Sequence, residues 1–283
     1  MFCTQGKTRF HSIAKSALAA ALATSGLVCG ASSIRLETAP PETEPERIYI
    51  SGKIEKGDDE KFIELATARV RTVVVSSRGG DYETGLSIGA AIHKLKMAVE
   101  VDGECFSACA QFIFPAGSTK SIRARSFLAF HAGDTTLKKL LLEEYAKFKP
   151  ARTADAEGLA ERVTNLRARH ALLEQEAASL NELVGIQPNA VEFFVALTSP
   201  RNLRAEINAA GTSHRATMQP APCDFWVPDA AGLRAIGIDV QDFKLPPVAS
   251  MARRLGVSAE RIYFGPAPSE SAPVQIDGLC AAK

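Results

Sequence analysis

The sequence predicts an α/β fold built around a mostly parallel sheet. Apolar, β-branched segments alternate with segments of helical spacing, in the order β-α-β-α-β-α-β, between residues 47 and 131. One of these segments holds three consecutive valines, Val73 to Val75, which is typical of a strand buried on both faces. The alternation indicates a parallel sheet with helices that cover it.

Four strands and three helices are expected in the first half of the chain. A strand over 47–52 ends at Gly52, and a helix is expected over 58–68, where apolar residues recur at helical spacing. The valine strand covers 71–76. The remaining expected elements are a helix over 82–95, a strand over 97–101, a short helix over 110–114 and a strand over 126–130.

Charged helical segments replace strands after residue 131. We expect helices over 136–148 and 154–183, and a short one over 189–197. An extended piece over 225–228 precedes a helix with Asp229 at its start, since aspartate is a preferred N-cap residue. A further short helix is expected over 248–255.

The N-terminal segment has the pattern of a secretory signal peptide. Lys7, Arg9 and Lys15 precede an apolar stretch over 17–28, and small residues follow it. This stretch is too short to span a bilayer. We expect cleavage near residue 31 and export to the periplasm or cell envelope. A lipid anchor at Cys29 is disfavoured, because no small residue stands directly before that cysteine.

The domain boundaries follow from these patterns. Residues 1–31 are expected to form the signal peptide, and 32–46, rich in Pro, Glu and Thr, a flexible leader. One folded domain is expected over 47–240, including a helical segment over about 136–198. Residues 241–283 are expected to form a C-terminal tail.

The charge of the processed chain argues against a nucleic-acid partner. Cleavage after residue 31 of the 283-residue chain leaves 30 Lys and Arg against 32 Asp and Glu. This balance gives no support to binding of nucleic acid or an anionic membrane surface.

A serine between a predicted strand and a predicted helix is the leading candidate for chemistry. Ser107 stands in the run Cys105-Phe106-Ser107-Ala108-Cys109, near the positive end of the helix that follows. Backbone N–H groups at such a turn can face a developing oxyanion. Gly79 and Gly80 lie before this serine, and His131 follows it by 24 residues. A glycine turn, a nucleophile and a base in this order suggest a hydrolase.

Each of these residues also has a structural interpretation. Serine is a common helix N-cap, and a Gly-Gly pair is common where a tight turn needs a positive φ. A histidine at a strand end can be a buried side chain bonded to a carbonyl. His131 is nevertheless the best base among the four mature histidines, since it alone ends an apolar strand, where a parallel sheet presents its active site.

The same residues resemble the ClpP/crotonase superfamily, and in particular the proteolytic subunit of the Clp protease. The run Ser77-Arg78-Gly79-Gly80, with Gly85 after it, is similar to that family's glycine turn and following helix. Ser107 falls where the family keeps its nucleophile, and Ala116-Gly117 resembles the end of its serine helix. The resemblance covers roughly residues 47–240, and the cysteines on both sides of Ser107 depart from it.

The resemblance implies a spiral of β-α units with a helical insertion after the fourth strand, and it implies roles for several residues. The N–H groups of Gly80 and Ala108 would form the oxyanion hole, with Gly79 supporting the turn. Asp224 falls within one residue of the family's orienting acid, with Asp134 and Asp229 as rivals. A dyad without an acid is a further alternative, because triad enzymes keep some activity without it. No cofactor is implied.

The cysteines allow several pairings. Cys105 could pair with Cys109, or one of them could pair with Cys223 and tie the region of Asp224 to the serine turn; free buried thiols are a third alternative. Four mature cysteines permit three complete pairings. A zinc site is disfavoured, because partner ligands at the usual spacing are missing.

We therefore predict an exported serine hydrolase, in particular a peptidase that acts on peptides or unfolded chains. No ATPase partner is expected outside the cytoplasm, and we expect a dimer or trimer. The first alternative is a binding protein of the envelope that keeps the fold without catalysis. The second is a crotonase-type acyl-CoA enzyme, which export disfavours because CoA thioesters are cytoplasmic.

Overall fold

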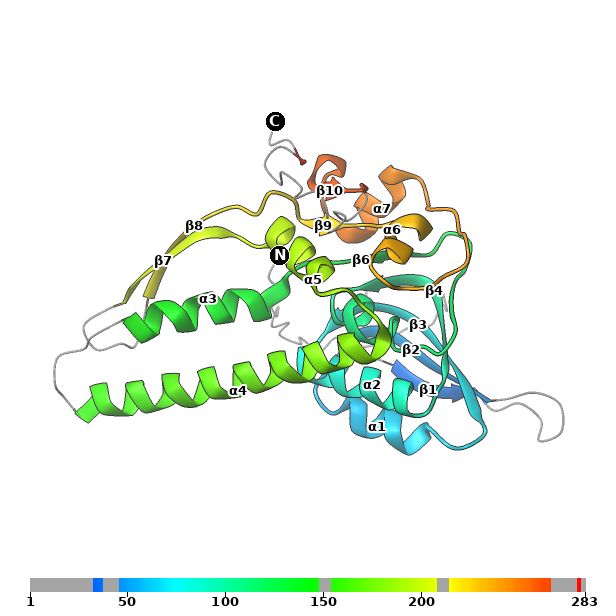
Figure 1. Cartoon of the computed structure of the whole chain (residues 1–283), viewed down its shortest axis with the longest axis horizontal. Coiled ribbons are helices and arrows are strands. Elements are labelled where there is room, and N and C mark those ends of the chain that lie inside the picture. Colours follow the sequence, from blue (N-terminus) through cyan, green and yellow to red (C-terminus); the bar gives the residue numbers. More distant parts are fainter. Residues whose placement is uncertain (1–32, 38–45, 148–153, 208–213, 266–278, 281–283) are drawn as a thin grey trace, which may run out of the picture.

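A six-stranded sheet with helices packed on it forms the centre of the molecule (Figure 1). The computed structural model describes residues 33–37, 46–147, 154–207, 214–265 and 279–280. The sheet has the order β1-β2-β3-β4-β5, with β6 also paired to β4. Every pair in this sheet is parallel except β1 with β2. The predicted α/β class and mostly parallel sheet are therefore confirmed.

The elements of the sheet region alternate as the sequence pattern predicts. They are β1 (Ser33–Glu37), β2 (Glu46–Ile54), α1 (Asp58–Leu65), β3 (Val70–Gly80), α2 (Tyr82–Lys94), β4 (Ala98–Phe106), the π-helical turn η1 (Cys109–Ile113), β5 (Lys120–Ile122) and β6 (Phe127–Ala129). The valines of β3 are all at most 3% exposed, because the strand lies in the middle of the sheet.

Two strands run further than expected and so reach the candidate site. β3 continues through Ser77 to Gly80, and β4 continues through polar residues to Phe106. Pairing of Ser77 with Cys105 joins these extensions, and Cys105 also pairs with Leu128 of β6. The extensions exist because neighbouring strands complete their hydrogen bonds, which local sequence patterns do not reveal.

The first strand lies inside the segment predicted to be a flexible leader. β1 pairs antiparallel with β2, and its Ile34 is 4% exposed within the core. The prediction of a flexible leader is thus wrong for Ser33–Glu37, where the alternation of Ile34 and Leu36 with polar residues is that of an edge strand. The signal peptide predicted for 1–31, including Cys29, lies outside the described residues.

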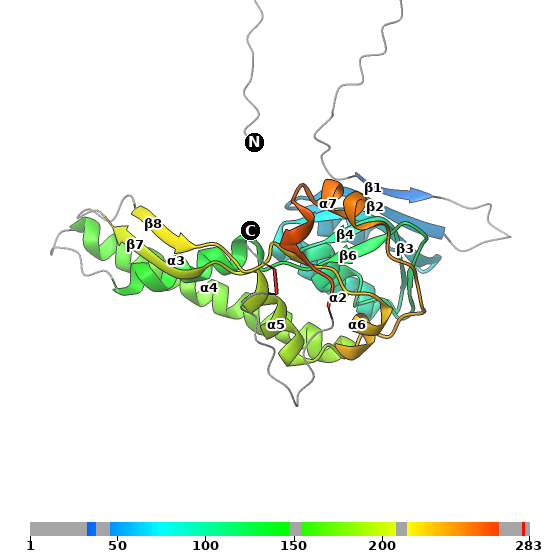
Figure 2. The same ribbon diagram turned by 90° about the horizontal axis from the view of Figure 1, so that it is seen from above.

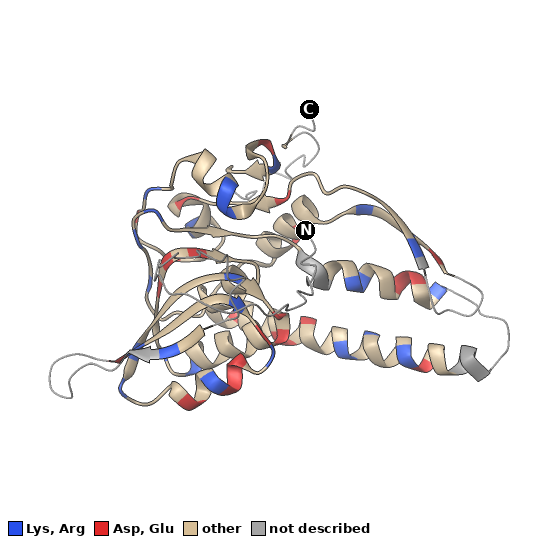
Figure 3. Cartoon of the chain, turned by 180° about the vertical axis from the view of Figure 1, so that it is seen from behind, with Lys and Arg blue, Asp and Glu red and all other residues tan. Residues whose placement is uncertain are grey.

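Two long helices and a hairpin extend from the sheet region as an arm (Figures 1 and 2). The helices are α3 (Gly133–Lys147) and α4 (Ala154–Val184), at the positions predicted for them. The hairpin consists of β7 (Arg201–Ile207) and β8 (His214–Gln219), and it was not predicted. His214 is the first residue of β8. Lys, Arg, Asp and Glu are intermixed along both helices (Figure 3).

The C-terminal region packs against β4, the strand that leads to Ser107. After α5 (Pro188–Thr198) come β9 (Phe225–Trp226), α6 (Ala230–Ala235), α7 (Val248–Leu255), the 3-10 turn η2 (Ala259–Arg261) and β10 (Ile262–Tyr263). Asp229 caps α6 as predicted, since its Oδ1 accepts the N–H of Gly232 at 2.8 Å. None of the described helices is both long and apolar enough to cross a membrane.

The predicted tail is part of this packing. Met251, Ala252 and Leu255 of α7 form a second core cluster with Phe106 and Phe127. Arg254 adds a hydrogen bond from Nε to Glu104 Oε2 at 2.9 Å, and its guanidinium lies 4.6 Å from the Phe127 ring centre. Phe106, the residue directly before Ser107, therefore packs against α7.

Candidate active site

Ser107 lies in a sharp turn between the end of β4 and the turn η1. Its φ of 51° is in the left-handed region, which non-glycine residues rarely adopt and which costs about 1–2 kcal/mol. Its N–H donates to the carbonyl of Ala129 in β6 at 3.1 Å. The N-cap position of η1 is Ala108, and no side chain caps this turn, so Ser107 is not the helix cap of the alternative interpretation. Strained backbone of this kind is concentrated at functional sites.

The two glycines at the end of β3 have different surroundings. Gly79 lies against the serine turn, because a Cβ added to it would meet Phe106 O at 2.5 Å and Ser107 Cβ at 2.7 Å. Gly80 lies against β2, where an added Cβ would overlap the carbonyl of Ile54. Their φ values of 74° and 151° also require glycine. Gly79 therefore occupies a tight turn that needs a positive φ, and it also lies next to Ser107.

Ser77 fixes this glycine turn and was missed as a site residue. Its side chain is fully buried, and its Oγ donates to the carbonyl of Gly52 at 2.6 Å while accepting the N–H of Gly79 at 3.1 Å. The Gly79 N–H is thus already occupied. Gly80 therefore remains the oxyanion-hole candidate on this strand.

Two glycines of α2 bring that helix onto the serine turn. A Cβ on Gly85 would lie 2.8 Å from the Cβ of Ala108, and one on Gly89 would lie 2.6 Å from the carbonyl of Phe112. The two glycines are four residues apart, so they share one face of the helix. The close approach they permit sets the place of Ala108, whose N–H is the second oxyanion-hole candidate.

We expect Gly85→Ala to lower reactivity at Ser107 without unfolding the protein. In a helix interior, alanine is intrinsically more favourable than glycine by about 1 kcal/mol. At this position, however, its methyl group must displace Ala108. Thermal unfolding and the rate of labelling at Ser107 by a serine-directed probe would test this. Ser87→Ala, on the same helix, is the control; equal labelling rates for both variants would contradict the expectation.

His131 follows β6 beside the serine turn. Phe106 pairs with Ala129 across β4 and β6, so Ser107 and His131 come just after the ends of adjacent parallel strands. The His131 ring lies 5.1 Å from the Phe225 ring, and Phe225 in turn lies 6.3 Å from Phe106. The structure therefore brings the predicted nucleophile and base to one corner of the sheet.

The backbone around His131 is held by side chains that the sequence did not identify. Gln111 Nε2 donates to the His131 carbonyl at 2.8 Å. The next N–H, of Ala132, donates to Thr198 Oγ1 at 2.7 Å, and that buried hydroxyl donates to the carbonyl of Phe194. Gln111 and Thr198 lie 20 and 66 residues from the groups they bind, so no local pattern marks them.

Asp224 precedes β9 and has a charged partner outside the predicted catalytic group. Its Oδ1 accepts a hydrogen bond from Arg261 Nη2 at 2.6 Å, and its N–H donates to the Arg261 carbonyl at 2.8 Å. This hydrogen bond raises the pKa of the Arg261 guanidinium above its ordinary value. Asp224 thus helps to hold η2 against the start of β9. Of its rivals, Asp229 caps α6, and the side chain of Asp134 lies outside the described residues.

Two disulfides settle the cysteine pairing. Cys105 is bonded to Cys109, and Cys223 is bonded to Cys280. Of the three alternatives that the sequence left open, the local disulfide between Cys105 and Cys109 is the one observed, whereas pairing of Cys223 with a cysteine of the serine turn is wrong, as are free thiols at these positions. The partner of Cys223 lies 57 residues further along the chain, which sequence spacing did not indicate. Two disulfides fit a periplasmic or extracellular location.

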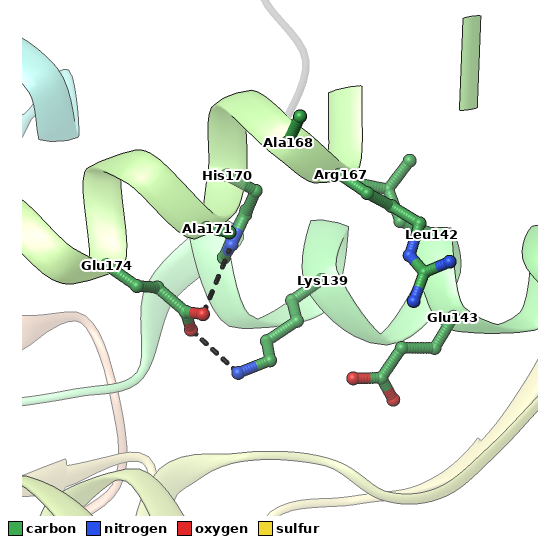
Figure 4. A pocket seen from close by; sticks show the side chains of 8 residues that line it. All are labelled: Lys139, Leu142, Glu143, Arg167, Ala168, His170, Ala171 and Glu174. Atoms are coloured by element: carbon green, nitrogen blue, oxygen red, sulfur yellow. Dashed lines mark hydrogen bonds and ion pairs between the residues drawn. The ribbon is translucent and has the colours of Figure 1, made fainter. Parts of the chain in front are cut away.

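Two hollows lie beside α4, and no predicted site residue lines either of them. One, of about 340 Å³, lies between α3 and α4 (Figure 4). Lys139 Nζ lies 2.7 Å from Glu174 in it, and His170 Nδ1 lies 3.7 Å from the same carboxylate. Burial, with Glu174 adding to it, raises the pKa of nearby Tyr82 to about 12, so this phenol stays neutral at physiological pH.

The second hollow, of about 620 Å³, lies between α2 and α4. Leucines such as Leu86, Leu172 and Leu183 line it together with polar and charged side chains. In the part of the chain that the structure describes, no three His, Cys, Asp or Glu side chains gather as a metal site needs.

Comparisons with known proteins place the chain in no family. No family model matches the sequence, and no curated protein is similar to it at a significant level. Among solved structures, the chain is similar to the ClpP1 N165D mutant from Listeria monocytogenes, with 14% sequence identity and a TM-score of 0.34. That match covers 70% of this chain and 92% of the other. A similarity this weak carries no argument, so the candidate site stands on the geometry above.

Proposed function

We propose that this chain is an exported serine hydrolase with a ClpP/crotonase-like core, acting on peptides or unfolded chains. Ser107 is the nucleophile and His131 the general base. The N–H groups of Gly80 and Ala108 bind the oxyanion. Asp224, whose Oδ1 pairs with Arg261, is the orienting acid in the triad form of this mechanism, and a Ser107-His131 dyad is the other form.

The conformation of Ser107 is the observation that supports this proposal most strongly. A serine with a φ of 51° is held at the end of a parallel strand, between the Gly79 turn and the strand that leads to His131. Neither helix capping nor strand pairing requires this conformation. A sharp strand-to-helix turn that presents a serine hydroxyl is the geometry of a nucleophile elbow.

The chemistry follows from these positions. His131 takes the proton from Ser107 Oγ as that oxygen attacks the substrate carbonyl, and it later returns the proton to the leaving amine. The tetrahedral intermediate carries a negative oxygen. In the described part of the chain the Ala108 N–H has no hydrogen-bond acceptor, as expected for the first N–H groups of a helical turn. It is therefore available to the oxyanion, and one such donor contributes about 3 kcal/mol to catalysis.

The test is covalent labelling by a fluorophosphonate, which reacts with activated serines. We expect the wild-type protein to be labelled and Ser107→Ala to be unlabelled. Ser118→Ala removes an exposed serine hydroxyl that bonds only a backbone carbonyl, and this control should label normally. His131→Ala should react at least about 100-fold more slowly, given the usual contribution of a general base.

Two outcomes would contradict the proposal. Labelling that persists in Ser107→Ala would place the reactive serine elsewhere. A folded wild-type protein that resists labelling would favour the alternative of a binding protein of the envelope without catalytic activity.

A further inference from the structure

We infer that Gln111 is the positioning residue that sets His131 against the serine turn. This inference rests on the proposed function, in which His131 acts as base for Ser107. Gln111 bonds to the backbone of both residues. Its role would therefore be to fix the separation and direction of two reacting groups that belong to different elements.

The contacts of Gln111 join the two halves of the site. Its N–H donates to the carbonyl of Ser107 at 2.9 Å, and its side-chain Nε2 donates to the carbonyl of His131 at 2.8 Å. The first bond fixes Gln111 relative to the left-handed turn. The second carries that position to the base, so a displacement of either segment strains the same residue.

On the side of the strand, Ala129 accepts the N–H of Ser107 at 3.1 Å, whereas the residues directly before and after His131 bond to the C-terminal part of the fold. Phe130 exchanges backbone hydrogen bonds with Trp226 of β9, at 2.8 and 2.9 Å. The Ala132 N–H donates to Thr198 at the end of α5. These bonds anchor His131 to the C-terminal part of the fold. Gln111 supplies a side-chain bond that ties the His131 backbone to the serine turn.

The place of the His131 backbone matters for catalysis as well as the orientation of its ring. A triad acid acts on the histidine through the ring, so the backbone has to be held by other bonds. The bond from Gln111 holds the carbonyl of His131, and the ring packs edge to face with Phe225. Small misplacements of a catalytic group have large effects, since about 1 Å can cost about 100-fold in rate.

The experiment compares Gln111→Met with Gln187→Met by fluorophosphonate inactivation and by the NMR signals of the His131 imidazole. Methionine has nearly the size of glutamine and lacks the donor, and Gln187 is exposed, so it controls for the substitution itself. We expect Gln111→Met to lower the limiting inactivation rate by about 10- to 100-fold. The probe concentration for half-maximal rate should stay within about twofold, because positioning acts on the reaction rather than on binding. The His131 signals should shift or double.

The outcomes separate this inference from the proposed function. If wild-type protein is not labelled, the proposed function fails, and the NMR comparison alone decides the role of Gln111. Unchanged His131 signals in Gln111→Met would overturn the inference, as would a changed half-saturation with an unchanged limiting rate. Should Gln111→Met not fold, Gln111→Asn, which keeps the amide on a shorter side chain, is expected to show the same rate loss.

Discussion

Gly79→Ala is expected to abolish fluorophosphonate labelling at Ser107. The added methyl group would meet the carbonyl oxygen of Phe106 at 2.5 Å and the Cβ of Ser107 at 2.7 Å. Neither contact belongs to the far end of a flexible side chain, so the clash can be relieved only by moving the serine turn or the end of β3. A shift of about 1 Å at the nucleophile should reduce labelling at least 100-fold.

Gly57→Ala is a matched control for this variant. Gly57 has a φ of 92°, close to the 74° of Gly79, so both alanines suffer the cost of a left-handed conformation, about 1 kcal/mol. Apart from its two neighbours in the chain, no described residue has an atom within 4 Å of a Cβ at Gly57. Labelling rates and urea unfolding of the two variants separate strain from steric displacement. If folded Gly79→Ala reacts as fast as Gly57→Ala, the close approach of β3 does not position Ser107.

The central sheet could be predicted because its signals are local. Buried parallel strands are continuous apolar runs, and the helices between them repeat apolar residues every three or four positions. β1, β5 and the hairpin of β7 and β8 were missed for a physical reason. Each is short or lies at a sheet edge, and each exists because a partner strand satisfies its backbone groups. Such pairing depends on residues far away in the chain.

The candidate site likewise has residues that local sequence patterns identify and hydrogen-bond partners that they do not. Ser107, Gly79 and His131 could be identified because strand ends and glycine turns mark the edge of a parallel sheet where reactive groups gather. The partners of Ser77, Gln111 and Asp224 could not be identified from spacing. Gly52 lies 25 residues from Ser77, and Arg261 lies 37 residues from Asp224. These hydrogen bonds form only once the fold brings the segments together.

The disulfide that contributes more to stability is expected to contribute less to the reactivity of Ser107, and the other disulfide the reverse. Cross-linking stabilises a fold mainly by restricting the unfolded chain, so the effect grows with the closed loop. Cys223 and Cys280 are 57 residues apart, and their replacement by alanine should lower the free energy of unfolding by about 4 kcal/mol. Cys105 and Cys109 are only four residues apart, which corresponds to about 2 kcal/mol. On stability alone, the longer loop should matter more.

Reactivity should follow the reverse order, because the short disulfide brackets the strained turn. Both of its cysteines are fully buried, and Ser107 stands midway between them with a φ of 51°. Without the covalent link, the turn can relax toward a right-handed conformation that no longer presents Oγ. We expect the Cys105→Ala/Cys109→Ala protein to lose labelling at Ser107 by at least about tenfold. The Cys223→Ala/Cys280→Ala protein should label normally wherever it is folded. Urea unfolding with labelling of each folded variant measures both quantities, and normal labelling of the Cys105→Ala/Cys109→Ala protein would mean that packing alone holds the nucleophile turn.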